Sequence, residues 1–260
     1  MIFKCQQEAE YQLDSLANIK RQSIIVEGGK GCGKTYLARH YAAKVGVPDF
    51  DIVDPKVDAI RSSIEECINL NKPIVICIEN LDKGVQAASS ALLKFLEEPP
   101  ANMYVIVTCQ NLQMIPDTII SRSSVVTLSP PIDSDIELYT RSKYGSKYDE
   151  FKNTTIWQSV RSFQDADLVM SMTSDKLAYF DSLPAICKFN DSVSNIIWKL
   201  GHYDDNSETP LEFVIRFIMS YIRTPFIEKC GIDCIRELNR GRIAQHAVLA
   251  KFVFNAKYCE

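Results

Sequence analysis

Between Ser23 and Thr35 the chain reads SIIVEGGKGCGKT, an apolar run that enters a glycine-rich turn. The turn fits the pattern G-x-x-x-x-G-K-[ST], and it lies between a predicted strand over residues 23–27 and a predicted helix over residues 35–44. In that context the glycines let backbone N–H groups converge on phosphate oxygens, and the helix directs the positive end of its dipole at the same anion. The sequence therefore predicts a site for a nucleoside triphosphate in this loop.

The residues of the loop have distinct predicted roles. Lys34 supplies a positive charge for the β- and γ-phosphates, and the hydroxyl of Thr35 is expected to ligate Mg²⁺. The others are expected to bind ATP mainly through their backbone: Gly28, Gly29, Lys30, Gly31, Cys32 and Gly33. ATP and Mg²⁺ are thus the predicted cofactors.

The chain on both sides of the loop alternates between apolar runs and helical patterns. Apolar runs typical of strands in a parallel sheet follow at residues 50–53, 73–78, 103–109 and 125–128. Helical patterns separate them, including one that we expect to begin at Pro55 with Asp54 as its N-cap. Strands separated by helices imply right-handed crossovers, so the predicted class is α/β.

After residues 130–131, a Pro-Pro pair, the pattern changes and the apolar residues favour helical spacing to the end of the chain. The polar stretch GHYDDNSET over residues 201–209 divides this half. We therefore predict a nucleotide-binding domain over residues 1–131 and two helical domains, over residues 132–200 and 201–260.

Composition sets limits on the partners. Of 260 residues 46% are hydrophobic and 24% charged, as in an ordinary globular protein, and the net charge of −4 argues against a surface that grips DNA alone. No run approaches the ~20 apolar residues that span a bilayer. The nine cysteines include no CxxC pair, which favours structural thiols over a zinc site. We expect a cytoplasmic protein with no membrane partner.

The apolar run over residues 73–78 is followed by Glu79, Asn80 and, two positions on, Asp82. A P-loop ATPase needs a carboxylate here for Mg²⁺ and a second one to activate water. Glu79 can ligate Mg²⁺, but Asn80 stands at the general-base position and cannot accept a proton. Asp82 could act as the base from a different position. The sequence predicts nucleotide binding with weak or absent hydrolysis.

Several segments resemble the clamp-loader branch of the AAA+ ATPases, above all the delta-prime and gamma/tau subunits of bacterial DNA polymerase III. The most specific is ALLKFLEEPP over residues 91–100, and IPDTIISRS over 115–123 is similar to the family's P-x-T-I-x-S-R-C segment. The resemblance is dense over residues 24–128 and only architectural beyond. It implies a subunit that assembles with other AAA+ clamp-loader subunits and loads a sliding clamp onto primer-template DNA.

The resemblance also implies roles for particular residues. Thr108 takes the sensor 1 position, which faces the γ-phosphate, and Arg122 takes that of an arginine finger donated to ATP on a neighbouring subunit. A planar guanidinium does suit the charge that develops on a transferring phosphoryl group. Gln164 stands where the family carries its sensor 2 arginine, and Arg161 could compensate for it. Ser123 replaces the cysteine that usually follows the finger.

In this family residues 132–200 would form a lid over the nucleotide and residues 201–260 a collar in which subunits pack side by side. The alternative for the collar is a helical appendage that closes the core. The stretch RSKYGSKY over residues 141–148 is either a lid loop or a surface for single-stranded nucleic acid. Five basic residues between positions 236 and 257 are expected either to face DNA or to be solvated: Arg236, Arg240, Arg242, Lys251 and Lys257.

The sequence is compatible with three functions. The first is a clamp-loader subunit, the second an autonomous AAA+ ATPase such as a helicase loader or remodelling ATPase, and the third a non-catalytic scaffold. The segments at residues 91–100 and 121–123 favour the first over the second, whereas Asn80 and Gln164 keep the third open. The interval over residues 36–72 lacks the zinc-binding insert of the bacterial cellular subunits, which favours a phage or mobile-element origin.

Overall fold

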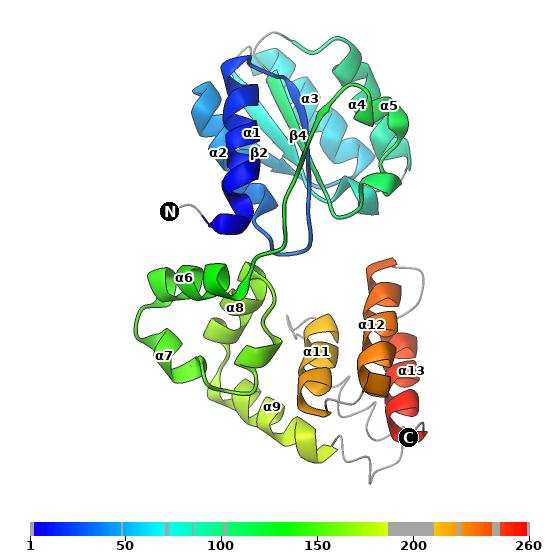
Figure 1. Ribbon diagram of the computed structural model, residues 1–260. Coiled ribbons are helices and arrows are strands. Elements are labelled where there is room, and N and C mark those ends of the chain that lie inside the picture. Colours follow the sequence, from blue (N-terminus) through cyan, green and yellow to red (C-terminus); the bar gives the residue numbers. More distant parts are fainter. Residues whose placement is uncertain are drawn as a thin grey trace. The chain divides into compact units, whose positions relative to one another are not determined.

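The computed structural model forms two compact units (Figure 1). The first comprises residues 1–136 with 162–164, and the second residues 137–161 with 165–260. The predicted boundary at residue 200 lies outside the described residues, so the division into three domains stays a prediction. The structure describes residues 3–47, 49–70, 73–84, 86–100, 103–186, 211–222, 225–240 and 245–258.

The first unit is built on a parallel five-stranded sheet in the order β2-β3-β4-β1-β5. This confirms the predicted α/β class, and each predicted apolar run forms a strand. The strands are β1 (Ser23–Glu27), β2 (Asp49–Val53), β3 (Ile74–Ile78), β4 (Met103–Cys109) and β5 (Ser124–Thr127).

Helices cover both faces of the sheet, because successive strand residues point to opposite faces. Ile24 and Val26 of β1 pack with α1 and α2, whereas Ile25 packs on the other face with α3, α4 and α5 (Figure 1). The short 3-10 helix η1 (Lys4–Gln6) leads directly into α1. The helices are α1 (Gln7–Asn18), α2 (Lys34–Val45), α3 (Val57–Leu70), α4 (Gln86–Glu97) and α5 (Asp117–Ile120).

The start of α3 differs from the prediction. The helix begins at Val57 rather than at Pro55, and its first backbone bond runs from Ile60 N–H to the Lys56 carbonyl. The Lys56 N–H donates to the Asp54 carbonyl at 2.7 Å, which closes a tight turn ahead of the helix. The expected N-cap at Asp54 is therefore wrong, because the turn moves the start of the helix along the chain.

The second unit is helical throughout its described residues, as the spacing predicts. Its core includes Phe180, whose ring meets those of Phe213 and Phe217 edge-on at centroid distances of 5.8 and 5.1 Å. None of the helices in the described part of the chain is long and apolar enough to cross a membrane. The elements that lie wholly or mostly in this unit are α6 (Asp133–Tyr144), α7 (Lys147–Phe151), η4 (Trp157–Ser159), α8 (Phe163–Ser171), α9 (Ser174–Ile186), α11 (Leu211–Ile222), α12 (Pro225–Arg240) and α13 (Gln245–Tyr258).

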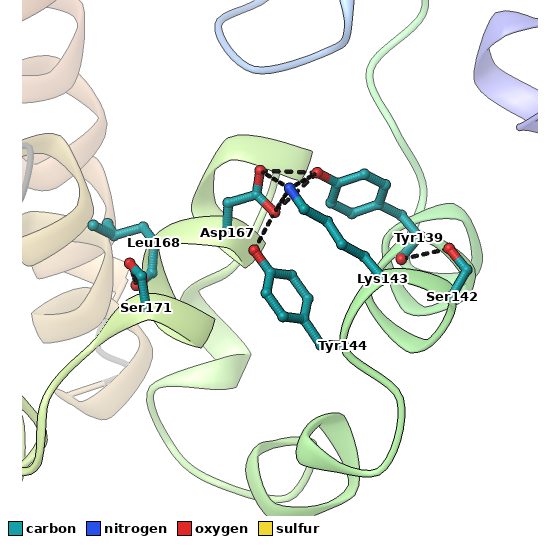
Figure 2. A network of polar contacts seen from close by, with 7 residues as sticks. All are labelled: Tyr139, Ser142, Lys143, Tyr144, Asp167, Leu168 and Ser171. Carbon is teal, nitrogen blue, oxygen red and sulfur yellow. Dashed lines mark hydrogen bonds and ion pairs between the residues drawn. The ribbon is translucent and has the colours of Figure 1, made fainter.

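The cation-rich and aromatic stretch over residues 141–148 is the end of α6, a turn and the start of α7. Figure 2 shows Asp167 of α8 at the centre of a polar network, where its carboxylate accepts hydrogen bonds from Lys143 at 2.9 Å and from Tyr139 and Tyr144 at 2.8 Å. The bond to Tyr139 and the Asp167 carboxylate raise the pKa of Lys143. These side chains join α6 to α8 and are engaged within the unit.

A second polar contact in this unit is more deeply buried. Arg216 of α11 donates through both terminal nitrogens to the Asp165 carboxylate at 2.8 Å, and the Arg161 N–H donates to the same carboxylate at 3.0 Å. The exposed fractions of the side chains are 19% for Arg216 and 10% for Asp165. This ion pair is bidentate and largely shielded from water, and it joins α11 to the start of α8.

We expect Arg216→Met to lower the free energy of unfolding by about 3 kcal/mol, because the buried Asp165 carboxylate loses the cation that balances its charge. Urea unfolding followed by tryptophan fluorescence reads this unit, since Trp157 and Trp198 both follow residue 136. The matched control is Arg141→Met, whose exposed ion pair is expected to contribute less than about 1 kcal/mol. Equal urea midpoints for the two variants would show that the Arg216 pair adds nothing.

Candidate nucleotide site

The glycine-rich loop lies at the carboxyl edge of the sheet, where β1 ends and α2 begins. The Gly28 N–H donates to the Cys109 carbonyl at the end of β4, 3.1 Å away, which fixes the start of the loop. Gly31 and Gly33 have φ angles of +70° and +96°, and residues that carry a Cβ rarely adopt this backbone conformation. The loop can therefore curl tightly enough to gather its N–H groups at the start of α2.

Lys34 is folded into this loop. Its side-chain nitrogen donates to the carbonyls of Gly28 at 2.7 Å and Gly29 at 2.8 Å, and only 8% of the residue is exposed. Burial lowers its pKa, since a charged ammonium loses hydration there. The loop thus holds a cation at its centre, as an anion site requires.

Thr35 and Glu79 meet at the same edge. The Thr35 hydroxyl donates to Glu79 Oε1 at 2.5 Å, and the Glu79 N–H donates to the Val53 carbonyl of β2 at 3.1 Å. Hydroxyl and carboxylate oxygens are ligands that Mg²⁺ accepts, usually from one or two carboxylates together with phosphates. The residues present fit a Mg²⁺–nucleotide, and the described residues contain no cluster of three or more acidic, His or Cys side chains that would hold a metal alone.

Asn80 and Thr108 are brought together across β3 and β4. The Asn80 N–H donates to the Thr108 hydroxyl oxygen at 3.0 Å, and Thr108 is 1% exposed. Asn80 has a left-handed φ of +52°, which asparagine tolerates better than most residues. The position that would carry a general base therefore has an amide side chain, and its backbone N–H is bound by the strand predicted to carry sensor 1.

Asp82 is engaged in the turn after β4. Its Oδ2 accepts hydrogen bonds from the N–H groups of Gln110 at 3.0 Å and Asn111 at 3.3 Å. Its Oδ1 is buried and makes no hydrogen bond to any residue that the structure describes. Asp82 thus has a structural partner that nothing in its sequence context predicts.

Residues 162–164 lie against the glycine-rich loop. The Phe163 N–H donates to the Gly31 carbonyl at 3.1 Å, and a Cβ built on Gly31 would stand 2.7 Å from the Cβ of Gln164. Gln164, at the predicted sensor 2 position, is therefore beside the loop. Arg161 belongs to the second unit, is exposed, and donates to the Val160 carbonyl at 2.7 Å.

One residue at the loop, Gln6, is not predicted by the sequence. Gln6 of η1 is 1% exposed and its side-chain nitrogen donates to the Cys32 carbonyl at 3.0 Å. Nothing in the local pattern marks this glutamine, because its neighbour Gln7 is the same residue type on the surface.

Arg122 lies at the opposite edge of the sheet. It follows α5 and precedes β5, and the hydroxyl of the next residue, Ser123, is 2.7 Å from that of Ser23 at the start of β1. The length of β1, roughly 17 Å at ~3.3 Å per residue, separates this edge from the glycine-rich loop. The guanidinium binds Glu97 at 3.0 Å and the Thr118 carbonyl at 2.9 Å, with 37% of the side chain exposed.

This sheet order, with a phosphate-type loop after β1 and a helical unit after the sheet, is that of the AAA+ fold. Among solved structures, a DNA polymerase III gamma subunit-related protein of Thermotoga maritima matches with a TM-score of 0.54 at 15% identity, covering 96% of this chain and 98% of that one. The RuvB Holliday junction branch migration motor of the same organism matches with a TM-score of 0.53 at 13% identity, covering 95% of this chain and 80% of that one. At these identities the likeness shows the fold alone.

Within that class, residues 52–132 match the family described as DNA polymerase III, delta subunit. The DNA polymerase III subunit delta' of Haemophilus influenzae is 28% identical over 142 residues, covering 50% of this chain and 43% of that protein. The match thus spans less than half of the relative's length. The predicted resemblance to AAA+ clamp-loader subunits is confirmed, and the family match contains both segments that suggested it, residues 91–100 and 115–123.

Proposed function

We propose that this protein is an ATP-binding subunit of a DNA-replication clamp loader, with weak or absent ATP hydrolysis of its own. It would assemble in the cytoplasm with other AAA+ subunits and help to load a sliding clamp onto primer-template DNA. The observation that carries the proposal is the position of Arg122 inside the family match. A phosphoryl-binding arginine at the edge of the sheet opposite its own glycine-rich loop is useful only to a neighbour.

The proposed ATP site is the glycine-rich loop over residues 28–35. When ATP binds, its phosphates would take over the bonds that Lys34 makes to loop carbonyls, and the backbone N–H groups of the loop would bind the same oxygens. Thr35 and Glu79 would hold Mg²⁺, which screens the phosphate charge. Thr108 and Gln164 would lie near the γ-phosphate as neutral dipoles.

Weak hydrolysis follows from the groups at the carboxyl edge. Asn80 cannot take a proton from water, and Gln164 cannot neutralise charge as an arginine would. Glu79 supplies one carboxylate, and the Thr35 hydroxyl already binds it. ATP would then act on the conformation of the subunit by binding, without being hydrolysed by it.

Two finer points belong to the same proposal. Contact with DNA would be shared with the partner subunits, since the net charge is −4. A phage or mobile-element origin rests on the missing zinc-binding insert in residues 36–72. The second candidate function, a non-catalytic scaffold, is favoured by the amide of Asn80, and it differs in needing no nucleotide.

We expect Lys34→Ala to abolish binding of ATP·Mg²⁺, because the loop loses the cation at its centre. Calorimetric titration with a non-hydrolysable ATP analogue measures this, with Lys44→Ala as a control at an exposed position of α2. If the wild-type protein binds no nucleotide at millimolar concentration, the ATP site is refuted and the non-catalytic scaffold becomes the supported function.

We expect Arg122→Ala to keep this protein's own nucleotide affinity and to slow ATP turnover by a complex with its partner subunit. Loss of an arginine finger costs ~10³-fold or more in rate. Steady-state ATPase assays of the assembled complex test it, and Arg61→Ala, an exposed arginine of α3, is the control. A mutant complex that turns over at the wild-type rate would refute the assignment of the finger.

We expect the isolated protein to bind ATP without measurable turnover. Combining Glu79→Asp, Asn80→Glu and Gln164→Arg restores the usual carboxylates and cation, each typically worth ~10²-fold or more. The triple variant should gain turnover when a partner supplies a finger, provided that circular dichroism shows it folded despite the left-handed backbone at residue 80. Robust hydrolysis by the wild-type protein, lost in Lys34→Ala, would favour an autonomous ATPase instead.

A further inference from the structure

The chain segment ahead of α1 makes a specific contact with the glycine-rich loop. The side chain of Gln6 donates from Nε2 to the Cys32 carbonyl at 3.0 Å, and Gln6 is 1% exposed. A Cβ built on Gly33 would stand 2.3 Å from the same nitrogen. The amide of Gln6 thus occupies the space that the missing side chain of Gly33 leaves, at the first turn of α2.

Stability does not account for an amide at this position. The Oε1 atom of Gln6 is buried and has no hydrogen-bond partner among the residues that the structure describes. A buried polar atom without a partner costs stability, and this cost offsets what the bond from Nε2 to the Cys32 carbonyl contributes. What the amide supplies is a donor to one carbonyl of the loop, which fixes the orientation of the peptide between Cys32 and Gly33.

The segment is anchored at its other side by Asp135. The carboxylate of Asp135 accepts the N–H groups of Lys4 at 2.9 Å and Cys5 at 3.1 Å, and Asp135 is 3% exposed. These are the first N–H groups of η1, which have no partner within the helix, and a carboxylate is the favourable charge there. Because Gln6 is the next residue of η1, Asp135 sets where its side chain begins.

We propose that Gln6 is a positioning residue for the glycine-rich loop and that Asp135 acts on the loop through Gln6. The inference rests on the proposed ATP binding and adds to it a residue pair outside the loop. Since Asp135 lies in α6, which continues into the second unit, the pair joins the loop to the start of that helix.

The first test replaces Gln6 by methionine, which keeps the length and removes the donor. Hydrogen–deuterium exchange of the peptide over residues 28–34, measured without nucleotide, should be faster in Gln6→Met than in the control Gln7→Met. Affinity for a non-hydrolysable ATP analogue with Mg²⁺ should fall roughly five- to tenfold, the worth of one hydrogen bond. The thermal unfolding midpoint should stay near that of wild type, which a purely structural residue would not allow.

A second variant separates the donor from the packing. In Gln6→Glu the side chain can donate to the Cys32 carbonyl only when it is protonated, and burial raises the pKa of a carboxyl group. Relative to wild type at the same pH, its ATP affinity should recover at pH 5.5 and be weak at pH 8. Gln6→Met should be equally weak at both.

The anchor is tested with Asp135→Asn against Asp133→Asn, an exposed aspartate in the same first turn of α6. Asp135→Asn should speed exchange in the loop and weaken ATP binding, whereas Asp133→Asn should do neither. If Asp135 acts through Gln6, the double variant with Gln6→Met should bind ATP no more weakly than Gln6→Met alone. Effects that multiply would refute this route.

The proposal fails if wild type binds ATP and Gln6→Met matches it within twofold with unchanged exchange in the loop. If wild type binds no nucleotide, the proposed function fails. The exchange experiment, which needs no nucleotide, still tests whether the hydrogen bond from Gln6 orders the loop. Should Gln6→Met not fold, Gln6→Glu at two pH values and Asp135→Asn decide the question.

Discussion

A loop that turns its N–H groups inward to an anion must leave carbonyl groups that need donors, and much of this structure follows from that constraint. Three separate parts of the chain supply them. Lys34 donates to two carbonyls from inside the loop, Gln6 donates to Cys32 from the segment before α1, and the Phe163 N–H donates to Gly31 from the start of α8. The loop therefore fixes positions far apart in sequence, which explains why residues 162–164 pack with the first unit.

The parallel sheet decides what can act within one subunit. All strands run in one direction, so the residues that follow them collect at one edge: the glycine-rich loop after β1, Glu79 and Asn80 after β3, and the end of β4 beside them. Residues that precede strands collect at the other edge, and Arg122 is one of them. On the proposed function, a complete catalytic site then needs two subunits, because no short movement carries a side chain along the length of β1.

The strands and the glycine-rich loop could be predicted from sequence because their signals are local. Continuous apolar runs mark β3 and β4, and glycines followed by Lys34 and Thr35 mark the loop. The start of α3 could not, since Asp54 and Pro55 form a valid cap signal that a backbone turn overrides. The contacts of Gln6 with Cys32 and of Asp135 with Lys4 join residues 26 and 131 positions apart. Only the fold brings such pairs together, and neither residue type is distinctive at its place.

On the proposed function, the segment after β3 explains why a well-formed loop would come with weak hydrolysis. Asn80 and Asp82 both bind the neighbouring strand, Asn80 through its N–H to Thr108 and Asp82 through its carboxylate to the turn after β4. The Asp82 carboxylate, which could act on water in a turnover site, is thus engaged in joining β3 to β4, and the side chain at residue 80 is an amide. A ligand that binds only the folded loop stabilises it in proportion to the logarithm of its concentration over Kd, whether or not it is cleaved. Such a ligand role requires Lys34, Thr35 and Glu79 for binding and is compatible with an amide at residue 80.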